Sequence, residues 1–148
     1  MLTGFHAAMG IAVLCANAVV AAWGAVAWLR GEPSVWFWYL LRVAQVVVVV
    51  QVAVGLWLLI SGNRPEDELH YLYGVSILAV TMVSEGMRIG AAQRELDEVE
   101  DLDALDHAEQ AALARRVVMR EMGVMTIGTL LIVTLALRAG ASAGGFGV

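Results

Sequence analysis

The chain has 148 residues, 60% of them hydrophobic, and a mean hydropathy of +0.76. Soluble domains are usually about 45–50% apolar, and several apolar runs here approach the ~20 residues needed to cross a bilayer. These values exclude an ordinary soluble domain and predict an all-α integral membrane protein, because a helix satisfies its own backbone hydrogen bonds in lipid. The net charge of −5 comes with no basic patch, so we expect no nucleic-acid partner.

Four apolar segments separated by polar stretches predict four helices that cross the bilayer. The predicted helices cover about residues 5–29, 34–60, 69–98 and 106–138. The second opens on Trp36-Phe-Trp-Tyr39, an aromatic cluster typical of a membrane–water boundary. The fourth begins at Asp106-x-x-Glu109, which resembles a capping box. We expect an antiparallel four-helix bundle forming one transmembrane domain over residues 1–138. The Gly/Ala/Ser-rich residues 139–148 are predicted to be a flexible tail.

The distribution of arginine predicts the orientation of this bundle in the membrane, because cytoplasmic loops are enriched in basic residues. Four crossings place both termini on one side, and the 30–33 loop and the 88–116 segment on the other. The second side holds seven arginines, namely Arg30, Arg42, Arg88, Arg94, Arg115, Arg116 and Arg120. The first side holds Arg64 and Arg138. We therefore expect a multi-pass protein of the plasma (inner) membrane, with both termini outside the cytoplasm and residues 88–116 inside it.

An acidic segment, residues 95–109, separates the third and fourth predicted helices and contains eight carboxylates in fifteen residues. Apolar residues recur in it at every third position, so one face of the segment can pack. They are Leu96, Val99, Leu102 and Leu105. The pattern favours a solvated, partly helical cytoplasmic hairpin. A docking surface for a basic partner and a weak divalent-cation site are the alternatives, although no spacing here matches an EF-hand loop.

Two histidines lie at equivalent positions of the first and third predicted helices, which cross the membrane in the same direction. His6 precedes Arg30 by 24 residues, and His70 precedes Arg94 by 24 residues. At ~1.5 Å of rise per residue, both side chains are expected at a similar depth near the outer surface. Two imidazoles facing each other from different helices of a bundle are what bis-histidine haem ligation requires. His6 and His70 are therefore candidate metal ligands.

Glycines one helical turn deeper accompany both histidines. Gly10 follows His6 by four residues and Gly74 follows His70 by four, so each glycine shares a helix face with its histidine. Gly55 occupies a comparable place in the second helix. A porphyrin between the helices needs the room that absent side chains leave. Gln51, four residues before Gly55, can offer a hydrogen bond to a ring substituent or to a water.

Charges near the outer surface agree with this interpretation. The N-terminus of a helix carries partial positive charge, which favours a neutral, metal-binding imidazole. Haem propionates would point outward, where Arg64 and Arg138 are placed to meet them.

Residues of the first three helices resemble one half of the haem A synthase family. The resemblance lies in Gln51-x-x-x-Gly55 followed by Leu69-His70-Tyr-Leu-Tyr-Gly74, with His6 matching the first histidine of a half, and covers about 85 residues. The family has two four-helix halves, each with a histidine pair near the outer surface. Here Ala7 follows His6 where the family commonly has arginine, the family's preceding acidic residue is absent, and there is one half. The resemblance thus implies haem b binding, as in four-helix membrane b-type cytochromes, for electron transfer or as an accessory module, rather than the oxidative chemistry of haem A synthesis.

Other interpretations of the same residues remain open. A histidine at a membrane boundary can be an interfacial anchor, and glycine in a membrane helix can serve close helix packing. The alternative function is a cofactor-free accessory or scaffold subunit of a membrane complex that binds a partner through the acidic segment. As partners we expect the lipid bilayer and either a membrane redox complex or further copies of the chain. No nucleophile–base pair is visible in the sequence, which favours a binding protein over a stand-alone enzyme.

Ionisable residues also occur near the inner boundary of the predicted membrane region. Glu85 and Arg88 lie on the third helix, and Arg120 and Glu121 on the fourth. We expect an ion pair between the helices, either Glu85 with Arg120 or Arg88 with Glu121. A proton-relay or quinone-binding role is the alternative, because ionisable groups near membrane depth are functional candidates.

Overall fold

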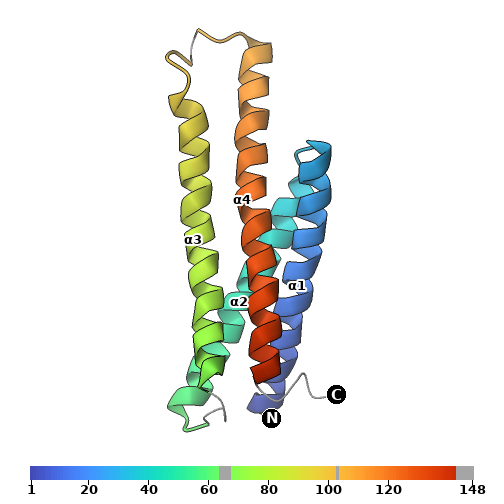
Figure 1. Cartoon of the computed structure of the whole chain (residues 1–148), viewed down its shortest axis with the longest axis vertical. Coiled ribbons are helices and arrows are strands. Elements are labelled where there is room, and N and C mark those ends of the chain that lie inside the picture. The colour runs from blue at the N-terminus through green and yellow to red at the C-terminus, as the bar shows by residue number, and fades with distance from the viewer. Residues whose placement is uncertain (64–67, 103, 143–148) are drawn as a thin grey trace.

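The chain folds into four helices and the segments that connect them (Figure 1). The computed structural model describes residues 1–63, 68–102 and 104–142. The helices are α1 (Leu2–Arg30), α2 (Val35–Ile60), α3 (Leu69–Asp97) and α4 (His107–Ser142). All four are long and apolar enough to cross a membrane. An all-helical chain with four candidate membrane spans is therefore confirmed.

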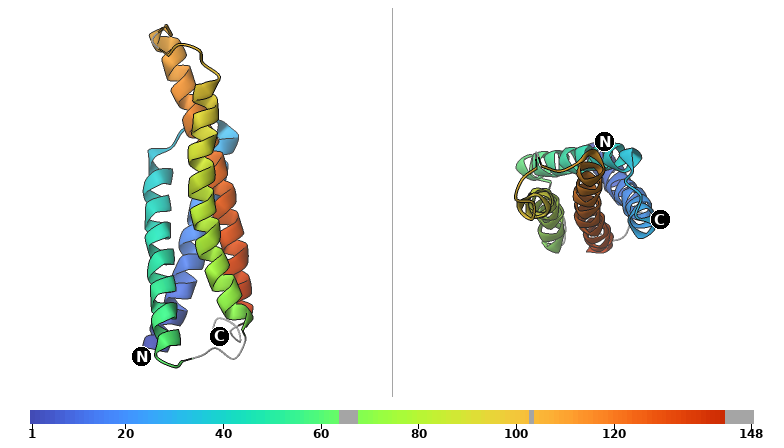
Figure 2. Two further views of the ribbon diagram at one scale, coloured as in Figure 1. Left: turned by 90° about the vertical axis from the view of Figure 1, so that its left-hand side faces the viewer. Right: turned by 90° about the horizontal axis from the view of Figure 1, so that it is seen from above.

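The fourth helix has the central position in the molecule. Seen along the long axis, α4 lies between α1 and α3, and α2 crosses behind this row (Figure 2). The start of α1, the end of α2, the start of α3 and the end of α4 share one end of the molecule, which we call the histidine end after His6 and His70 (Figure 1). At the opposite end, α3 and α4 extend beyond α1 and α2 to the connection formed by residues 98–106. We call this the hairpin end.

Three helix boundaries follow from local chemistry. Gly31 ends α1 in the left-handed conformation, at φ 66°, which a glycine adopts without steric penalty. The hydroxyl of Ser34 accepts hydrogen bonds from the backbone N–H of Phe37 and from the Trp23 indole, and so caps the start of α2. The predicted capping box is confirmed: Oδ1 of Asp106 accepts from the N–H of Glu109 at 2.8 Å, and Oε2 of Glu109 accepts from the N–H of Asp106 at 2.9 Å.

Two helices are longer than the sequence predicts, because residues beyond the predicted ends continue the helical hydrogen bonding. The first begins at Leu2 rather than near residue 5. The fourth continues to Ser142, so residues 139–142 belong to α4, and the prediction of a flexible tail is wrong for them. In this last turn the Ser142 hydroxyl donates to the backbone carbonyl of Ala139 at 3.0 Å. Residues 143–148 lie outside the described part of the chain.

Small residues let the helices approach α4 closely. A Cβ built on Gly24 would lie 2.6 Å from the Phe37 ring and would also overlap the Thr126 hydroxyl, and one on Gly128 would overlap Ser84. Close approach of this kind is how membrane helices associate, because lipid is as apolar as the side chains it would replace. The large buried side chains around these contacts include Val20, Phe37, Leu41, Val48 and Met122.

Most of the outer surface of the helices is apolar. Leucines, valines, tryptophans and isoleucines are exposed along all four, far beyond the few hundred Å² of apolar patch that a soluble monomer shows. Examples from each helix are Trp23, Val46, Val75 and Leu131. Such a surface requires lipid or protein to cover it, in agreement with the hydropathy of the spans.

Candidate functional site

The structure brings His6 and His70 together at the histidine end. Their ring centroids are 5.9 Å apart and the ring planes are inclined by 66°. Both side chains are partly buried. The two residues are 64 positions apart in the sequence, and they meet because α1 and α3 both start at this end of the molecule (Figure 1).

The second helix closes one side of the His6 ring. Nε2 of the Gln51 amide lies 3.4 Å from Nε2 of His6. One turn further along α2, a Cβ on Gly55 would come within 3.0 Å of Cε1 of His6, so the absence of a side chain there creates the space for the ring. On α1 a Cβ at Gly10 would lie 3.4 Å from Nε2 of Gln51. The His6 ring thus contacts Gln51 and Gly55, and Gly10 in turn packs against Gln51.

The fourth helix contacts the other histidine. Nδ1 of His70 lies 3.3 Å from the backbone carbonyl oxygen of Ala139. A carbonyl only accepts, so this contact requires the proton on Nδ1 and leaves the lone pair on Nε2. Arg138 is exposed on the last turns of α4 and directly precedes Ala139 in the sequence. Arg64 lies outside the described residues.

The remaining predicted site residue, Gly74, has no close neighbour. A Cβ built there meets no described atom within 4 Å. Gly74 therefore leaves open space beside α3 rather than a tight contact with another helix.

Buried polar atoms without a partner concentrate at this end of the molecule. Among the described residues they are Nδ1 of His6, Oε1 of Gln51, the Tyr71 hydroxyl and the Thr126 hydroxyl. The first three belong to the histidine end. Buried polar atoms in folded proteins almost always have a partner, so these atoms are placed to hydrogen-bond a bound group.

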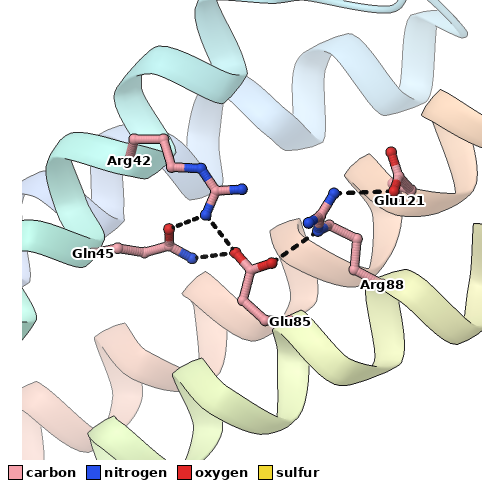
Figure 3. Close-up of polar contacts among 5 residues, drawn as sticks. All are labelled: Arg42, Gln45, Glu85, Arg88 and Glu121. Atoms are coloured by element: carbon pink, nitrogen blue, oxygen red, sulfur yellow. Dashed lines mark hydrogen bonds and ion pairs between the residues drawn. The ribbon is translucent and has the colours of Figure 1, made fainter.

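A second polar cluster lies between α2, α3 and α4, nearer the hairpin end (Figure 3). The Glu85 carboxylate accepts from Arg42 at 2.7 Å, from the Gln45 amide at 2.6 Å and from Nε of Arg88 at 2.9 Å. Arg88 also donates, through Nη1, to Oε1 of Glu121 at 3.0 Å. Two arginines and two glutamates make the cluster neutral, as is required of ionised groups within an apolar bundle.

The observed ion pairs match the two pairs expected from the sequence only in part. Arg88 pairs with Glu121, one of the two predicted combinations, but Arg120 does not pair with Glu85. Arg120 instead joins Arg116 in binding Glu95, whose side chain is 7% exposed. Arg42 and Gln45 of α2 were not predicted as partners of Glu85, because ion pairs were expected only between α3 and α4. Their spacing of three residues on α2, which puts both on one face, was the available signal.

Between the two clusters the bundle interior is mainly apolar, with residues such as Val48 and Ile132, but a few polar side chains lie within it. A cavity of about 10 Å³, the size of a single water, touches Asn17, Gln45, Thr81, Ser84 and Thr129. The buried Asn17 amide donates to the carbonyl of Val13 at 2.9 Å.

The two histidines are the metal-ligand candidates that the fold brings together. Within residues 1–63, 68–102 and 104–142, no group of three His, Cys, Asp or Glu side chains could hold a metal ion. Two imidazoles are the protein ligands of a bis-histidine haem, in which the porphyrin supplies the other four.

No protein-family model matches the chain, and comparisons with curated proteins and with solved structures give no match.

Proposed function

We propose that this chain is a small membrane protein that binds haem b, with His6 and His70 as axial ligands. The observation that carries the proposal is the approach of the two imidazoles to 5.9 Å between helices that start at the same end. Bound haem would supply a one-electron redox couple, which suits electron transfer or an accessory role in a membrane redox complex.

Several features of the histidine end fit such a group. Imidazole–metal bonds are about 2.0–2.1 Å, so two rings on opposite sides of one metal have centroids separated by a distance of the order of that found here. Gly55 provides the space for the His6 ring, and Gly74 leaves the α3 face open. The unpartnered atoms of His6 and Gln51 are available to a ligand.

The residues around the pair prepare both rings for binding. The carbonyl of Ala139 accepts from Nδ1 of His70 and so keeps Nε2 free, which is the tautomer-fixing contact found around metal-bound histidines. Gln51 contacts Nε2 of His6 at 3.4 Å, longer than a usual N–H donor bond, and a metal could replace so weak a contact. Arg138 supplies a cation for propionates at the boundary.

The proposal includes the orientation of the chain in the membrane. We place the four helices as an antiparallel bundle in the plasma membrane, with both termini and the histidine end outside the cytoplasm and residues 88–116 inside. Seven arginines on one side against two on the other support this orientation. Haem would then lie close to the outer surface, within reach of an external electron donor or acceptor.

The test is the absorption spectrum of the protein purified in detergent after expression with added haem precursor. We expect a Soret band, α and β bands on reduction typical of two imidazole ligands, and a pyridine haemochrome of haem b. His6→Ala and His70→Ala should each remove these bands at unchanged protein yield. His107→Ala is the matched control and should keep them, since His107 is exposed at the hairpin end. A colourless wild-type protein, or bands that survive both substitutions, would contradict the proposal.

A further inference from the structure

An apolar groove opens at the hairpin end, far from the histidines. It has a volume of about 480 Å³ and is lined by eight residues, seven of them apolar. Leu96 comes from the last turn of α3, Leu102 and Leu105 from the connection, and Leu113 and Val117 from α4. The volume falls in the range of about 300–1,000 Å³ that is typical of ligand sites.

Among the described residues, neither α1 nor α2 extends over the groove (Figure 2). The α3–α4 pair extends beyond α1 and α2 at this end (Figure 2). Leu102 is 48% exposed and Leu96 is 36% exposed, whereas Leu113 at the base is buried. Exposed leucines in a short polar connection are unfavourable in water, since each buried CH₂ group would contribute about 0.8 kcal/mol.

The groove has an acidic rim. Asp97, Glu98 and Glu100 lie between Leu96 and Leu102, and Asp106 and Glu109 follow Leu105, all exposed. Three of the basic side chains nearby are engaged elsewhere: Arg116 and Arg120 pair with Glu95, and Arg115 donates to the carbonyl of Gly31. Arg94, exposed in the last turn of α3, is a fourth basic side chain nearby. The five rim carboxylates outnumber this single arginine, so the rim carries an excess of negative charge.

This combination selects one kind of occupant. A second copy of the chain would bring an acidic rim against an acidic rim, and anionic lipid headgroups would be repelled in the same way. An amphipathic helix can bury the leucines under its apolar face and pair Lys or Arg beside that face with the carboxylates. We propose that the groove at the hairpin end binds a basic amphipathic helix of a partner protein. The proposal does not depend on haem binding at the other end.

The first experiment uses a synthetic probe with the full-length protein in nanodiscs of zwitterionic lipid. The probe is a fluorescent Leu/Lys peptide of about five helical turns, with leucines at i, i+3, i+4 and i+7. A peptide of the same composition in scrambled order and a Leu/Glu peptide are the controls, and empty nanodiscs give the background. Fluorescence anisotropy should show saturable binding of the amphipathic basic peptide, weakened at least tenfold for each control.

Variants of the protein then locate the binding site. Leu102→Ala/Leu105→Ala should weaken binding about tenfold, as should Glu98→Gln/Glu100→Gln, and the second pair should also reduce the salt dependence. These residues are exposed or half-exposed, so the fold tolerates the changes.

The matched controls alter the same residue types outside the groove. Leu56→Ala/Leu72→Ala removes two exposed leucines at the histidine end, and Glu32→Gln removes a carboxylate from the α1–α2 connection. Both should bind as the wild type does. Equal binding of the scrambled peptide, or an equal loss in control and groove variants, would overturn the proposal.

Photocrosslinking in native membranes identifies the natural occupant. A photoreactive amino acid at position 102 should crosslink to a partner, and the crosslinked peptide should belong to a basic amphipathic segment. A crosslink to a second copy of this chain, to lipid alone, or to a segment without basic residues would overturn the assignment.

Discussion

Gly55 lies directly against the imidazole of His6, so that a Cβ on Gly55 would come within 3.0 Å of ring atom Cε1. The contact joins the end of one polar–glycine pattern, Gln51-x-x-x-Gly55, to the start of another, His6-x-x-x-Gly10. Side-chain space in α2 therefore determines where the His6 ring lies, although the two residues belong to different helices.

Substituting Gly55 tests whether this space serves haem binding. Gly55→Val should move the His6 ring and reduce haem affinity at least about tenfold, equal to about 1.4 kcal/mol. The measurement is Soret absorbance per mole of protein during haem titration. Gly86→Val is the control, since a Cβ at Gly86 meets no described atom within 4 Å. Identical titrations for both variants would show that the His6 position is irrelevant to binding.

Gly24 should be the glycine most sensitive to substitution for stability. A Cβ there would lie 2.6 Å from Cε2 of Phe37, which is fully buried and cannot retreat. Gly24→Ala should lower the free energy of unfolding by about 1–3 kcal/mol, as overpacked cores do. Unfolding by denaturing detergent in mixed micelles measures the change. Gly90→Ala serves as the comparison because its Cβ meets open space, and an equal loss there would show that helix flexibility, not packing, is responsible.

Helix positions in this chain could be predicted from the sequence because hydropathy and capping residues are local signals. The start of α4 was found from Asp106 and Glu109 alone, which bond reciprocally. The end of α4 was not, because Ala139 to Ser142 have the composition of a flexible segment. The side chain of His70 contacts the carbonyl of Ala139 in that last turn, a tertiary contact that composition does not reveal.

The meeting of His6 and His70 followed from counting residues to the inner arginines, which gives depth but not rotation about the helix axis. Rotation decides which side chains meet, as for Glu85, which binds Arg42 of α2 rather than Arg120 of α4. Gly74 illustrates the same limit. It shares its helix spacing with Gly10, yet Gly10 faces Gln51 and Gly74 faces no described side chain.

The capping box should control the order of the hairpin end. Asp106→Ala removes the acceptor for the N–H of Glu109 and should destabilise the first turn of α4 by about 1 kcal/mol. Hydrogen exchange followed by mass spectrometry should show faster exchange in residues 107–112. Exchange in the membrane spans should stay as in the wild type. Glu100→Ala, also an exposed acid but outside the helices, should leave that exchange unchanged. Uniformly faster exchange in both variants would point to loss of charge rather than of the cap.

Arg88 holds the second polar cluster together, because it donates to Glu85 at 2.9 Å and to Glu121 at 3.0 Å and lies 5.6 Å from the Trp38 ring centroid. Arg88→Leu leaves Glu121 without the cation that pairs with it in the described structure, whereas Glu121→Leu leaves Arg88 bound to Glu85. We therefore expect the arginine substitution to be the more destabilising one, by about 1–2 kcal/mol, since a half-buried charge is left uncompensated.

The double variant Arg88→Leu/Glu121→Leu decides whether the pair is coupled. An unpaired Glu121 carboxylate should lower the free energy of unfolding only when Arg88 is missing. The double variant should therefore lose about 1–3 kcal/mol less free energy of unfolding than the two single variants lose together. Unfolding in mixed micelles gives all four free energies. The distant pair Glu32→Leu and Arg138→Leu, at opposite ends of the molecule, should be additive within about 0.5 kcal/mol. Additivity at Arg88 and Glu121 as well would mean that each charge is stabilised by lipid headgroups or water, and that the cluster in Figure 3 contributes little to holding α3 and α4 together.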